Sequence, residues 1–547
     1  AHGDLSLMVK CGVQFGLFGG AILHLGSKHH HDAYLRDMMS VDLPGCFAMT
    51  ETGHGSNVQE LRTTATYDPV TQEFLIDTPD DAARKDYIGN AGKHGRMAAV
   101  FAQLVVGGEA HGVHCLLVPI RTAKGKPCDG VRLEDCGPKM GLNGVDNGRI
   151  WFDGVRVPRE NLLDRYAQVT PEGEYRSDIE SPGKRFFTML GTLIQGRVCI
   201  AGASNSAAKN ALVIATRYAN RRRQFGPPDG DEVTIMSYPT HKLRLLPRLA
   251  ATYALHFAQT KLVADLHESF ASGEDDRRVL ESDAAGLKAL ASWHARDVIQ
   301  VARECCGGAG YMAENRFAAL KADTDVFTTF EGDNIVLLQL VGKSLLTNYQ
   351  HEFGSLDPFG TARFVASQVL EVVGERTAVR ELITRLADDL IPGRDEGELD
   401  HEVELALLQW RAEHILASLA RRLRGGIEDG GDPFEVFMAC QDHVVAAGRA
   451  HVEHHVLDCF TKTVAACPDE HVQHTLSRLC HLYALWLIVL DRGWFQEHGR
   501  LSSTRSKAIQ KAGRKLCDEL APQAEELVAA FGIPDAAIGA PIATSGA

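Results

Sequence analysis

The sequence predicts a mostly α-helical protein with a central antiparallel β-barrel or sandwich domain. Residues 44–161 consist of short β-prone runs separated by Gly, Pro, Asp and Asn turns, without helical patterns between them. From Lys184 onward, apolar residues recur at helical spacing over long stretches. A chain of 547 residues is too long for one compact core, so we expect three or four domains.

The elements follow in this order. Residues 5–40 read as helical, because apolar residues recur there near helical spacing. The β-prone runs that come next are Cys46–Thr50, Leu61–Tyr67, Glu73–Ile76, Ala98–Val106, His114–Ile120 and Arg149–Phe152. Their spacing favours an antiparallel barrel or sandwich over βαβ units. The polar stretch 170–183 reads as a linker.

The remainder is predicted to be long amphipathic helices. After a first helix that begins near Lys184, they are expected at 240–272, 280–306, 334–348, 361–390, 400–424, 434–462, 470–492 and 501–531. Pro239, Pro392, Pro433, Pro468 and Pro534 lie between these helices or just past an end, as expected of helix breakers.

Composition excludes some classes of partner and location. The formal net charge of −14 argues against a nucleic-acid partner. Thirteen cysteines without a CxxC pair indicate reduced thiols. The apolar stretch 15–25 is too short to span a bilayer, and the chain shows no signal peptide and no SKL-type C-terminus. We therefore expect a cytoplasmic protein without a membrane span, whose true N-terminus is missing because Ala1 lies within a helical pattern.

Common nucleotide and metal motifs do not fit. The chain has no GxGxxG fingerprint, and Gly342-Lys343-Ser344 lacks the first glycine of a P-loop because Leu337 takes its place. His451, Glu453, His454 and His455 do not follow the HExxH order, so a solvated helix face is favoured over a metal site. No metal is expected, and any nucleotide must be held in another way.

Three segments carry possible chemistry, and each has a plainer alternative. The turn Thr50–Asn57 offers hydroxyls and glycines that let a flavin ring or a phosphate approach closely, but it equally fits a surface hairpin. The arginines of 221–223 suit a pyrophosphate or a solvated helix end. Glu331, between aromatics and a glycine, suits a general base or an ordinary helix start, with Asp333 or Asn334 as the N-cap.

Taken in order, six segments resemble the acyl-CoA oxidase branch of the acyl-CoA dehydrogenase superfamily. The six are Gly45–Asn57, Gly137–Gly141, Val155–Asn161, Arg222–Gly226, Cys306–Tyr311 and Phe330–Asn334. The resemblance implies an acyl-CoA dehydrogenase-like fold with an added C-terminal helical domain. Four domains follow from it: a remnant of the N-terminal helical domain (1–43), a flavin-contacting β-domain (44–165), a helical bundle (182–350) and the C-terminal helical domain (351–547).

The resemblance also assigns roles to residues. Glu331 matches the catalytic base of the family. Thr50, Gly55 and Ser56 match the loop that contacts the FAD. Gly89 matches a glycine of oxidases where dehydrogenases carry a hydroxyl residue, and its missing side chain would leave room for O2 beside the flavin.

Further roles concern the neighbouring subunit and the substrate. Arg222, Gln224 and Phe225 match residues that reach the FAD of the neighbouring subunit, and Gly308 matches a glycine near its adenine half. A homodimer is therefore implied. Asp333 is assigned to the cofactor as well. Arg197 matches an arginine near the substrate, although a helix ion pair would also account for it.

The implied activity is the FAD-dependent oxidation of acyl-CoA to trans-2-enoyl-CoA, with O2 as acceptor and H2O2 as product. The alternative within the superfamily is a dehydrogenase that passes electrons to an electron-transfer flavoprotein. A more remote alternative is a catalytically silent FAD-binding scaffold, against which the retained Glu331 argues.

Overall fold

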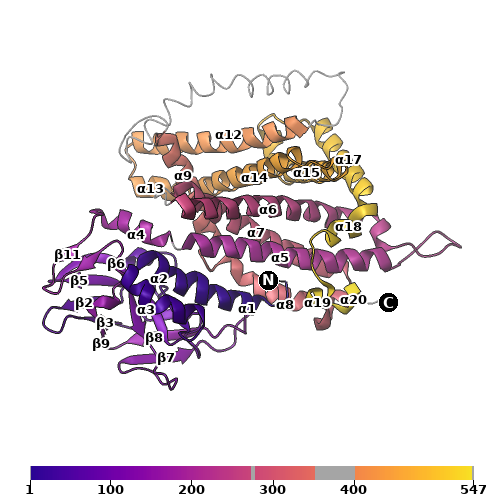
Figure 1. The fold of residues 1–547 in the computed structure, drawn as a ribbon. Helices are drawn as coiled ribbons and strands as arrows, with labels where there is room; N and C mark the ends of the chain where they lie inside the picture. Colours follow the sequence, from indigo (N-terminus) through magenta and orange to yellow (C-terminus); the bar gives the residue numbers. More distant parts are fainter. Residues whose placement is uncertain (1, 192, 273–276, 352–400, 545–547) are drawn as a thin grey trace. The chain divides into compact units, whose positions relative to one another are not determined.

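The computed structural model describes residues 2–191, 193–272, 277–351 and 401–544 (Figure 1). The chain forms two compact units. Gly3–Cys199 makes up the first, and the second contains His2 and the chain from Ile200 onward. The finer division at residues 43, 165 and 350 stays a prediction.

The first unit begins with short helices, as the spacing of apolar residues predicts. These are α1 (Leu5–Cys11), a π-helical segment (Gly12–Phe18), α2 (Gly19–Leu25) and α3 (Lys28–Met39). Asp4 caps α1 by accepting a hydrogen bond of 2.9 Å from the Leu7 N–H. Phe18, Ile22 and Leu25 are buried against the sheet that follows, so these helices cover one of its faces.

Most of the β-structure lies in two sheets. The larger has the order β1 (Gly45–Ala48), β5 (Met97–Val106), β2 (Thr64–Asp68), β3 (Glu73–Asp77) and β9 (Val155–Pro158), with β6 (Glu109–Pro119) paired to β5. The smaller consists of β4 (Lys85–Ile88), β8 (Gly148–Phe152) and β7 (Val131–Asp135). A short ribbon of β10 (Gln168–Val169) and β11 (Tyr175–Arg176) follows.

Strand β5 lies at the centre of the larger sheet and is buried on both faces. Ala98, Val100 and Ala102 pack into the core among the strands. Ala99 and Phe101 point the other way, into the core that the N-terminal helices cover. Burial on both faces explains why this strand reads as an almost continuous apolar run instead of an alternating one.

The second unit is helical. Its helices are α5 (Leu193–Arg221, beginning in the first unit), α6 (Pro239–Ser272), α7 (Arg278–Cys305), α8 (Phe317–Asp325), α9 (Asn334–His351), α12 (His401–Glu428), α13 (Pro433–Ala439), α14 (Gln441–Ala465), α15 (Glu470–Leu490), α16 (Arg492–Glu497), α17 (Ser503–Leu520), α18 (Ala524–Ala529), α19 (Asp535–Ile538) and α20 (Pro541–Thr544). Helix α4 (Pro182–Leu190) belongs to the first unit.

Helices α6, α7, α9 and α14 pack against one another, and α12 and α15 pack on α14. The contact between α9 and α14 depends on glycine. A Cβ at Gly342 would lie 2.6 Å from Val444 Cγ1, and one at Gly448 would lie 2.5 Å from the Leu338 carbonyl oxygen. Neither position has room for a side chain, so the two helix backbones approach closely there.

The predicted fold class is confirmed, with differences in detail. The β-domain is mixed, because β5 pairs in parallel with β1 and β2. The predicted helix 434–462 is interrupted at Cys440, where the backbone leaves helical geometry. The predicted helix 501–531 breaks after Leu520. The predicted helix 361–390 lies outside the described residues.

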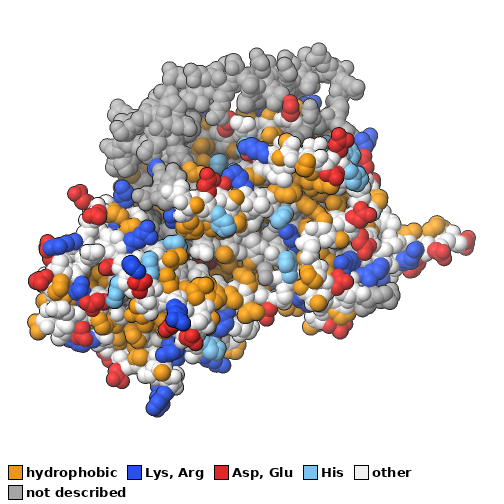
Figure 2. All heavy atoms as spheres, in the orientation of Figure 1, with side chains coloured by type: hydrophobic (Ala, Val, Ile, Leu, Met, Phe, Trp, Pro, Cys, Tyr) orange, Lys and Arg blue, Asp and Glu red, His pale blue; other side chains and the backbone are white. Residues whose placement is uncertain are grey.

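Two helical stretches within the described residues are long and apolar enough to cross a membrane. In Leu193–Arg221, 78% of the most apolar window is buried inside the protein, and in Leu5–Leu25 the share is 50%. Buried core helices of globular proteins meet the same criteria, so these two stretches are weak evidence of a membrane span. Figure 2 shows acidic, basic and hydrophobic side chains interspersed over the visible face.

Candidate active site

The turn after β1 is held by the segment that leads into β4. The Asp86 N–H donates to the Thr50 carbonyl at 3.0 Å, and the Thr52 N–H donates to the Arg84 carbonyl at 3.1 Å. The Gly53 N–H donates to the Ala82 carbonyl at 2.8 Å. Residues 50–53 and 82–86 therefore lie side by side, and these backbone hydrogen bonds fix the conformation of the 50–56 turn.

A buried ion pair lies beneath this turn. Lys85 Nζ is 3.0 Å from Glu51 Oε1, and both side chains are fully buried. Glu51 also accepts hydrogen bonds from the Arg62 N–H (2.8 Å) and the Thr63 N–H (2.9 Å). Burial would raise the pKa of Glu51, but the Lys85 charge and these N–H groups lower it overall. Burial lowers the pKa of Lys85 to about 8, against the opposing effect of Glu51.

The predicted cofactor residues of the first unit lie at the exposed side of this framework. Thr50 is half-buried, whereas Gly55 and Ser56 are exposed. No atom lies within 4 Å of a Cβ added at Gly55, so a bound group can approach this backbone closely. Along the neighbouring segment, Tyr87 is 63% exposed with φ +64°.

Gly89 lies against the N-terminal helical segment. A Cβ at this position would lie 2.8 Å from Val13 Cγ2. Val13 therefore leaves no room for a side chain at Gly89, and the expected opening for O2 beside the flavin stays a prediction.

In the second unit, a hairpin-like loop follows α5 and extends from the end of this helix (Figure 1). The Gln224 N–H donates to Val233 (3.1 Å), and the Val233 N–H donates to Phe225 (2.8 Å). Arg222 is exposed, Gln224 is half-buried, and the Phe225 ring is 77% exposed with φ +58°. The loop thus presents an arginine and an aromatic ring to the surroundings.

The other two arginines of this run, Arg221 and Arg223, donate hydrogen bonds to backbone carbonyls of the same chain. Arg221 donates to the carbonyls of Ile542 (3.2 Å) and Ala543 (2.8 Å), and Arg223 donates to the Glu232 carbonyl (2.7 Å). The guanidinium groups of Arg221 and Arg223 are thus engaged by carbonyls of their own chain. Arg222 remains the candidate for a pyrophosphate.

Gly308 lies on the exposed turn that follows α7. No atom lies within 4 Å of a Cβ added there. Tyr311, three residues later, is 82% exposed. An open glycine next to an exposed aromatic ring leaves a surface on which a planar group can pack.

Glu331 lies in the tight turn before α9. Its backbone has φ +55°, and Gly332 has φ +102°. A left-handed conformation is costly for a residue other than glycine, by about 1–3 kcal/mol, and is found mostly where surrounding contacts impose it. Glu331 itself is partly buried, and the Phe330 ring packs on Phe327 at 5.4 Å between centroids.

Lys288 of α7 supports this turn from inside the protein. It is fully buried, and its Nζ donates to the Gly332 carbonyl (2.6 Å) and to Asn334 Oδ1 (3.1 Å). Asn334 Nδ2 in turn donates to the Ala289 carbonyl (3.2 Å) and to Ser292 Oγ (2.9 Å). Sequence reasoning missed Lys288, since a lone lysine in an apolar helix gives no signal of its partner 44 positions later.

Asp333 is the N-cap of α9. Its Oδ1 accepts hydrogen bonds from the Ile335 N–H (2.9 Å) and the Val336 N–H (3.4 Å). The capping role predicted for Asp333 or Asn334 therefore belongs to Asp333, and its assignment to the cofactor stays a prediction. Arg197 is buried on α5, 7% exposed, and its substrate role stays a prediction too.

The residues present fit a flavin dinucleotide. In the first unit, the exposed Tyr87 offers a planar ring, and the turn at Gly55 offers accessible backbone N–H groups. In the second, Arg222, Phe225 and Gly308 offer a cation, an aromatic ring and an open turn. No group of three or more His, Cys, Asp or Glu within the described ranges is placed to hold a metal ion.

Three family descriptions match the chain. Residues 46–155 match the middle domain of acyl-CoA dehydrogenases, residues 190–346 match the acyl-CoA oxidase C-alpha1 domain, and residues 400–546 match the acyl-CoA oxidase family. Together they cover both units.

Relatives agree over nearly the full length of the chain. Acyl-coenzyme A oxidase 2, peroxisomal, of Arabidopsis thaliana is 41% identical over 99% of this chain and 78% of its own. The crystal structure of acyl-CoA oxidase1 from Yarrowia lipolytica superposes with a TM-score of 0.87 at 30% identity, covering 99% of this chain and 79% of that one. Acyl-CoA oxidase-2 of Caenorhabditis elegans, bound with FAD, ascaroside-CoA and ATP, has a TM-score of 0.83 at 25% identity, with 98% and 77% covered.

The relatives also correct the expected location. Relatives from Arabidopsis thaliana and Homo sapiens are named peroxisomal, so the expectation of a cytoplasmic protein is wrong. Composition and reduced cysteines do not separate the two compartments. The order of the six segments, by contrast, is a reliable signal, and the chain belongs to the acyl-CoA oxidase family.

Proposed function

We propose that this protein is an FAD-dependent acyl-CoA oxidase that converts an acyl-CoA thioester to trans-2-enoyl-CoA, the first step of fatty-acid β-oxidation. O2 is the electron acceptor, and H2O2 is the second product. The observation that carries the proposal is Glu331, a carboxylate on a strained turn that Lys288 supports. This turn lies within the stretch that matches the acyl-CoA oxidase C-alpha1 domain.

Glu331 serves as the base. The α-C–H of a thioester is only weakly acidic, so a carboxylate must be positioned against it while the developing enolate is stabilised. The Glu331 carboxylate takes the α-proton, and its backbone N–H donates to the thioester carbonyl oxygen. The partial burial of Glu331 limits water around the carboxylate, which strengthens both interactions.

Nine residues would hold the cofactor. They are Thr50, Gly55, Ser56, Gly89, Arg222, Gln224, Phe225, Gly308 and Asp333. When bound, FAD would supply the acceptor for the β-hydride and the redox chemistry that passes the electrons to O2. The chain itself contributes hydrogen bonds from the 50–56 turn, the guanidinium of Arg222 and the Phe225 ring, while Arg197 contributes to the substrate side.

A homodimer belongs to the proposal. The Phe225 ring is 77% exposed at the end of an extended loop, and Arg222 is exposed beside it. An exposed aromatic ring and an arginine are residue types enriched at interfaces. In this arrangement the loop of one subunit completes the FAD site of the other.

The substitution Glu331→Gln tests the assignment. Under anaerobic conditions, acyl-CoA should bleach the flavin of the wild-type protein, and Glu331→Gln should slow bleaching by about 10²–10⁴-fold while FAD stays bound. Glu435→Gln removes an exposed carboxylate of the same unit and should bleach at the wild-type rate. Bleaching of Glu331→Gln at that rate would remove the residue from the base role.

Oxygen uptake separates the two enzyme classes. The wild-type protein should consume O2 and release H2O2 on addition of acyl-CoA with no acceptor protein present. Bleaching without oxygen uptake would instead identify a dehydrogenase that needs an electron-transfer flavoprotein.

A further inference from the structure

The N-terminal helical segment contacts the stretch that contains Tyr87 and Gly89. Lys10, Val13 and Gln14 are spaced three and four positions apart, so they share one side of the helix. The segment Gly12–Phe18 is wound as a π-helix, a rare form that is frequent at functional sites.

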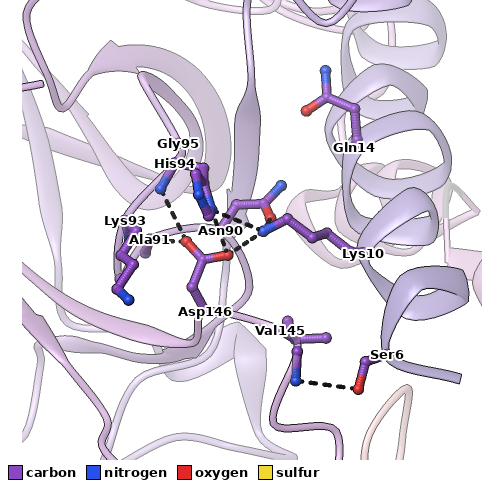
Figure 3. A network of polar contacts seen from close by, with 12 residues as sticks. Ser6, Lys10, Gln14, Asn90, Ala91, Lys93, His94, Gly95, Val145 and Asp146 are labelled. Carbon is purple, nitrogen blue, oxygen red and sulfur yellow. Dashed lines mark hydrogen bonds and ion pairs between the residues drawn. The ribbon is translucent and has the colours of Figure 1, made fainter. Parts of the chain in front are cut away.

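Lys10 extends from this helix to three polar groups (Figure 3). Its Nζ donates to Asn90 Oδ1 at 2.9 Å, lies 3.1 Å from His94 Nδ1 and forms an ion pair with the Asp146 carboxylate. The same carboxylate accepts hydrogen bonds from the N–H groups of Lys93 (2.8 Å) and His94 (2.9 Å). A single cation therefore joins both ends of the 90–94 stretch to the helix.

This ion pair is largely shielded from solvent. The Asp146 side chain is 8% exposed and that of Lys10 is 28% exposed, so the attraction is screened less than at the surface. Burial would raise the pKa of Asp146, but the hydrogen bonds from Lys10, His94 and Lys93 hold it well below its usual range. The Asp146 carboxylate therefore stays ionised when it pairs with Lys10.

Asn90 connects Lys10 to strand β1. It is 3% exposed, and its Nδ2 donates to the Gly45 carbonyl, at the start of β1, at 2.9 Å. Gln14 holds the same point, because its Oε1 accepts a hydrogen bond of 2.8 Å from the Gly45 N–H. Tyr87 and Asn90 both adopt left-handed backbone conformations (φ +64° and +68°) on either side of Gly89. Surrounding contacts must hold two such residues in place.

Val13 packs against Gly89, in the middle of the 87–94 segment. It is 8% exposed, and its Cγ2 lies 2.8 Å from the place that a Cβ at Gly89 would take. The helix thus places the Lys10 cation against residues 90–94 and the Val13 side chain against Gly89, so that it contacts most of the 87–94 segment.

We propose that Lys10 is a positioning residue for the flavin, fixing the 87–94 segment against Val13 through Asn90 and Asp146. The role rests on the proposed function, in which Gly89 and its neighbours contact the FAD. Lys10 acts through other residues and makes no contact with reacting atoms.

The test measures FAD affinity in the full chain. The variant Lys10→Met keeps the apolar stem of the side chain and removes the ammonium group. Apoprotein is titrated with FAD, and the dissociation constant is read from flavin fluorescence. We expect this constant to rise about tenfold in Lys10→Met and to return to within about threefold of wild type in Lys10→Arg.

A matched control separates positioning from general stability. Arg156→Met breaks exposed ion pairs of the same unit, with Asp68 and Glu73 at 3.3 Å each, and should leave the FAD dissociation constant unchanged. If Lys10→Met does not fold, Asp146→Asn is the second variant: its one oxygen can still accept from the two N–H groups, while the charge and the acceptor for Lys10 are lost. It should weaken FAD binding in the same way.

Two outcomes would overturn the inference: an FAD dissociation constant of Lys10→Met equal to that of wild type, or an equal rise in Arg156→Met. Neither outcome would contradict the proposed function. That function would instead fail if Glu331→Gln left the rate of flavin bleaching unchanged.

Discussion

Lys85 connects several parts of the first unit through one ammonium group. It donates to the Met49 carbonyl (3.1 Å) and the Phe101 carbonyl (2.7 Å) besides pairing with Glu51. All three groups are buried, so water does not compete for them. A buried charge pair of this kind is costly to desolvate, and its value lies in the unique position that it gives the residues around it.

Removal of Lys85 should therefore destabilise the first unit strongly. Lys85→Met leaves the Glu51 carboxylate buried without its cation, and we expect the free energy of unfolding to fall by about 3–5 kcal/mol. Urea denaturation followed by circular dichroism measures this change. Arg62→Met is the control, since Arg62 pairs with Asp80 at the surface (47% and 45% exposed) and should cost less than about 1 kcal/mol. Equal losses in both variants would contradict this account.

The sequence indicates the residues of the proposed site only in part. Ordered motifs predict roles for Glu331 and the 50–56 turn, and these roles stay predictions. Lys85, Lys288 and Lys10 were missed, since each is a lone lysine whose partners lie far along the chain. For Lys10, the spacing to Val13 and Gln14 in an otherwise apolar helix was the available signal.

At the level of elements, apolar periodicity predicts the long helices and the apolar strands well. Strand β4 (Lys85–Ile88) escaped prediction because it contains two buried charges and lacks an apolar pattern. Those charges are compensated by Glu51 on the adjacent turn, and by Arg84 and Arg149 around Asp86. A window of sequence cannot reveal compensation that comes from another strand.

Helix α12 is joined to its neighbours by a second buried network. Arg411 is 1% exposed, pairs with Glu453 of α14 at 2.6 Å, and forms an ion pair with Asp491 at the start of α16. Burial would raise the pKa of Glu453, but Arg411 and Arg449 lower it overall. Three helices thus share one guanidinium.

We expect Arg411→Met to lower the free energy of unfolding of the second unit by about 3–5 kcal/mol, because it leaves part of the Glu453 charge uncompensated. Arg424→Met is matched to it on the same helix, since Arg424 forms an i,i+4 pair with Glu428 that is 32% and 51% exposed. That control should change stability by less than about 0.5 kcal/mol. Urea denaturation compares the two, and a small effect of Arg411→Met would show that Arg449 alone suffices for Glu453.

For the whole molecule, enclosed histidines predict sensitivity to acid. Burial lowers the pKa of His114, His294 and His451 to about 4 each, from an ordinary value of 6.5. His294 is also hydrogen-bonded to Thr252 Oγ1 at 2.8 Å, which joins α6 and α7. Between pH 6.5 and pH 4 the unfolded chain binds more protons at these residues than the folded chain does.

The melting temperature should therefore fall as pH is lowered from about 7 to about 5, with each histidine costing roughly 1 kcal/mol per pH unit below its unfolded pKa. Scanning calorimetry at several pH values measures the slope. Replacing His294 with Gln removes one titrating group and should make the slope shallower, and a slope that does not change in this variant would exclude His294 as a contributor.

The close approach of Gly342 and Gly448 limits how this protein can be altered. Helix α9 carries the Glu331 turn at its N-terminal end and meets α14 eight residues into the helix, about 12 Å along its axis. A side chain at either glycine would require α9 and α14 to move apart, and because the Glu331 turn leads directly into α9, we expect this movement to displace the Glu331 carboxylate as well. Engineering of substrate range should therefore leave this helix crossing untouched and vary residues on α9 that face away from α14.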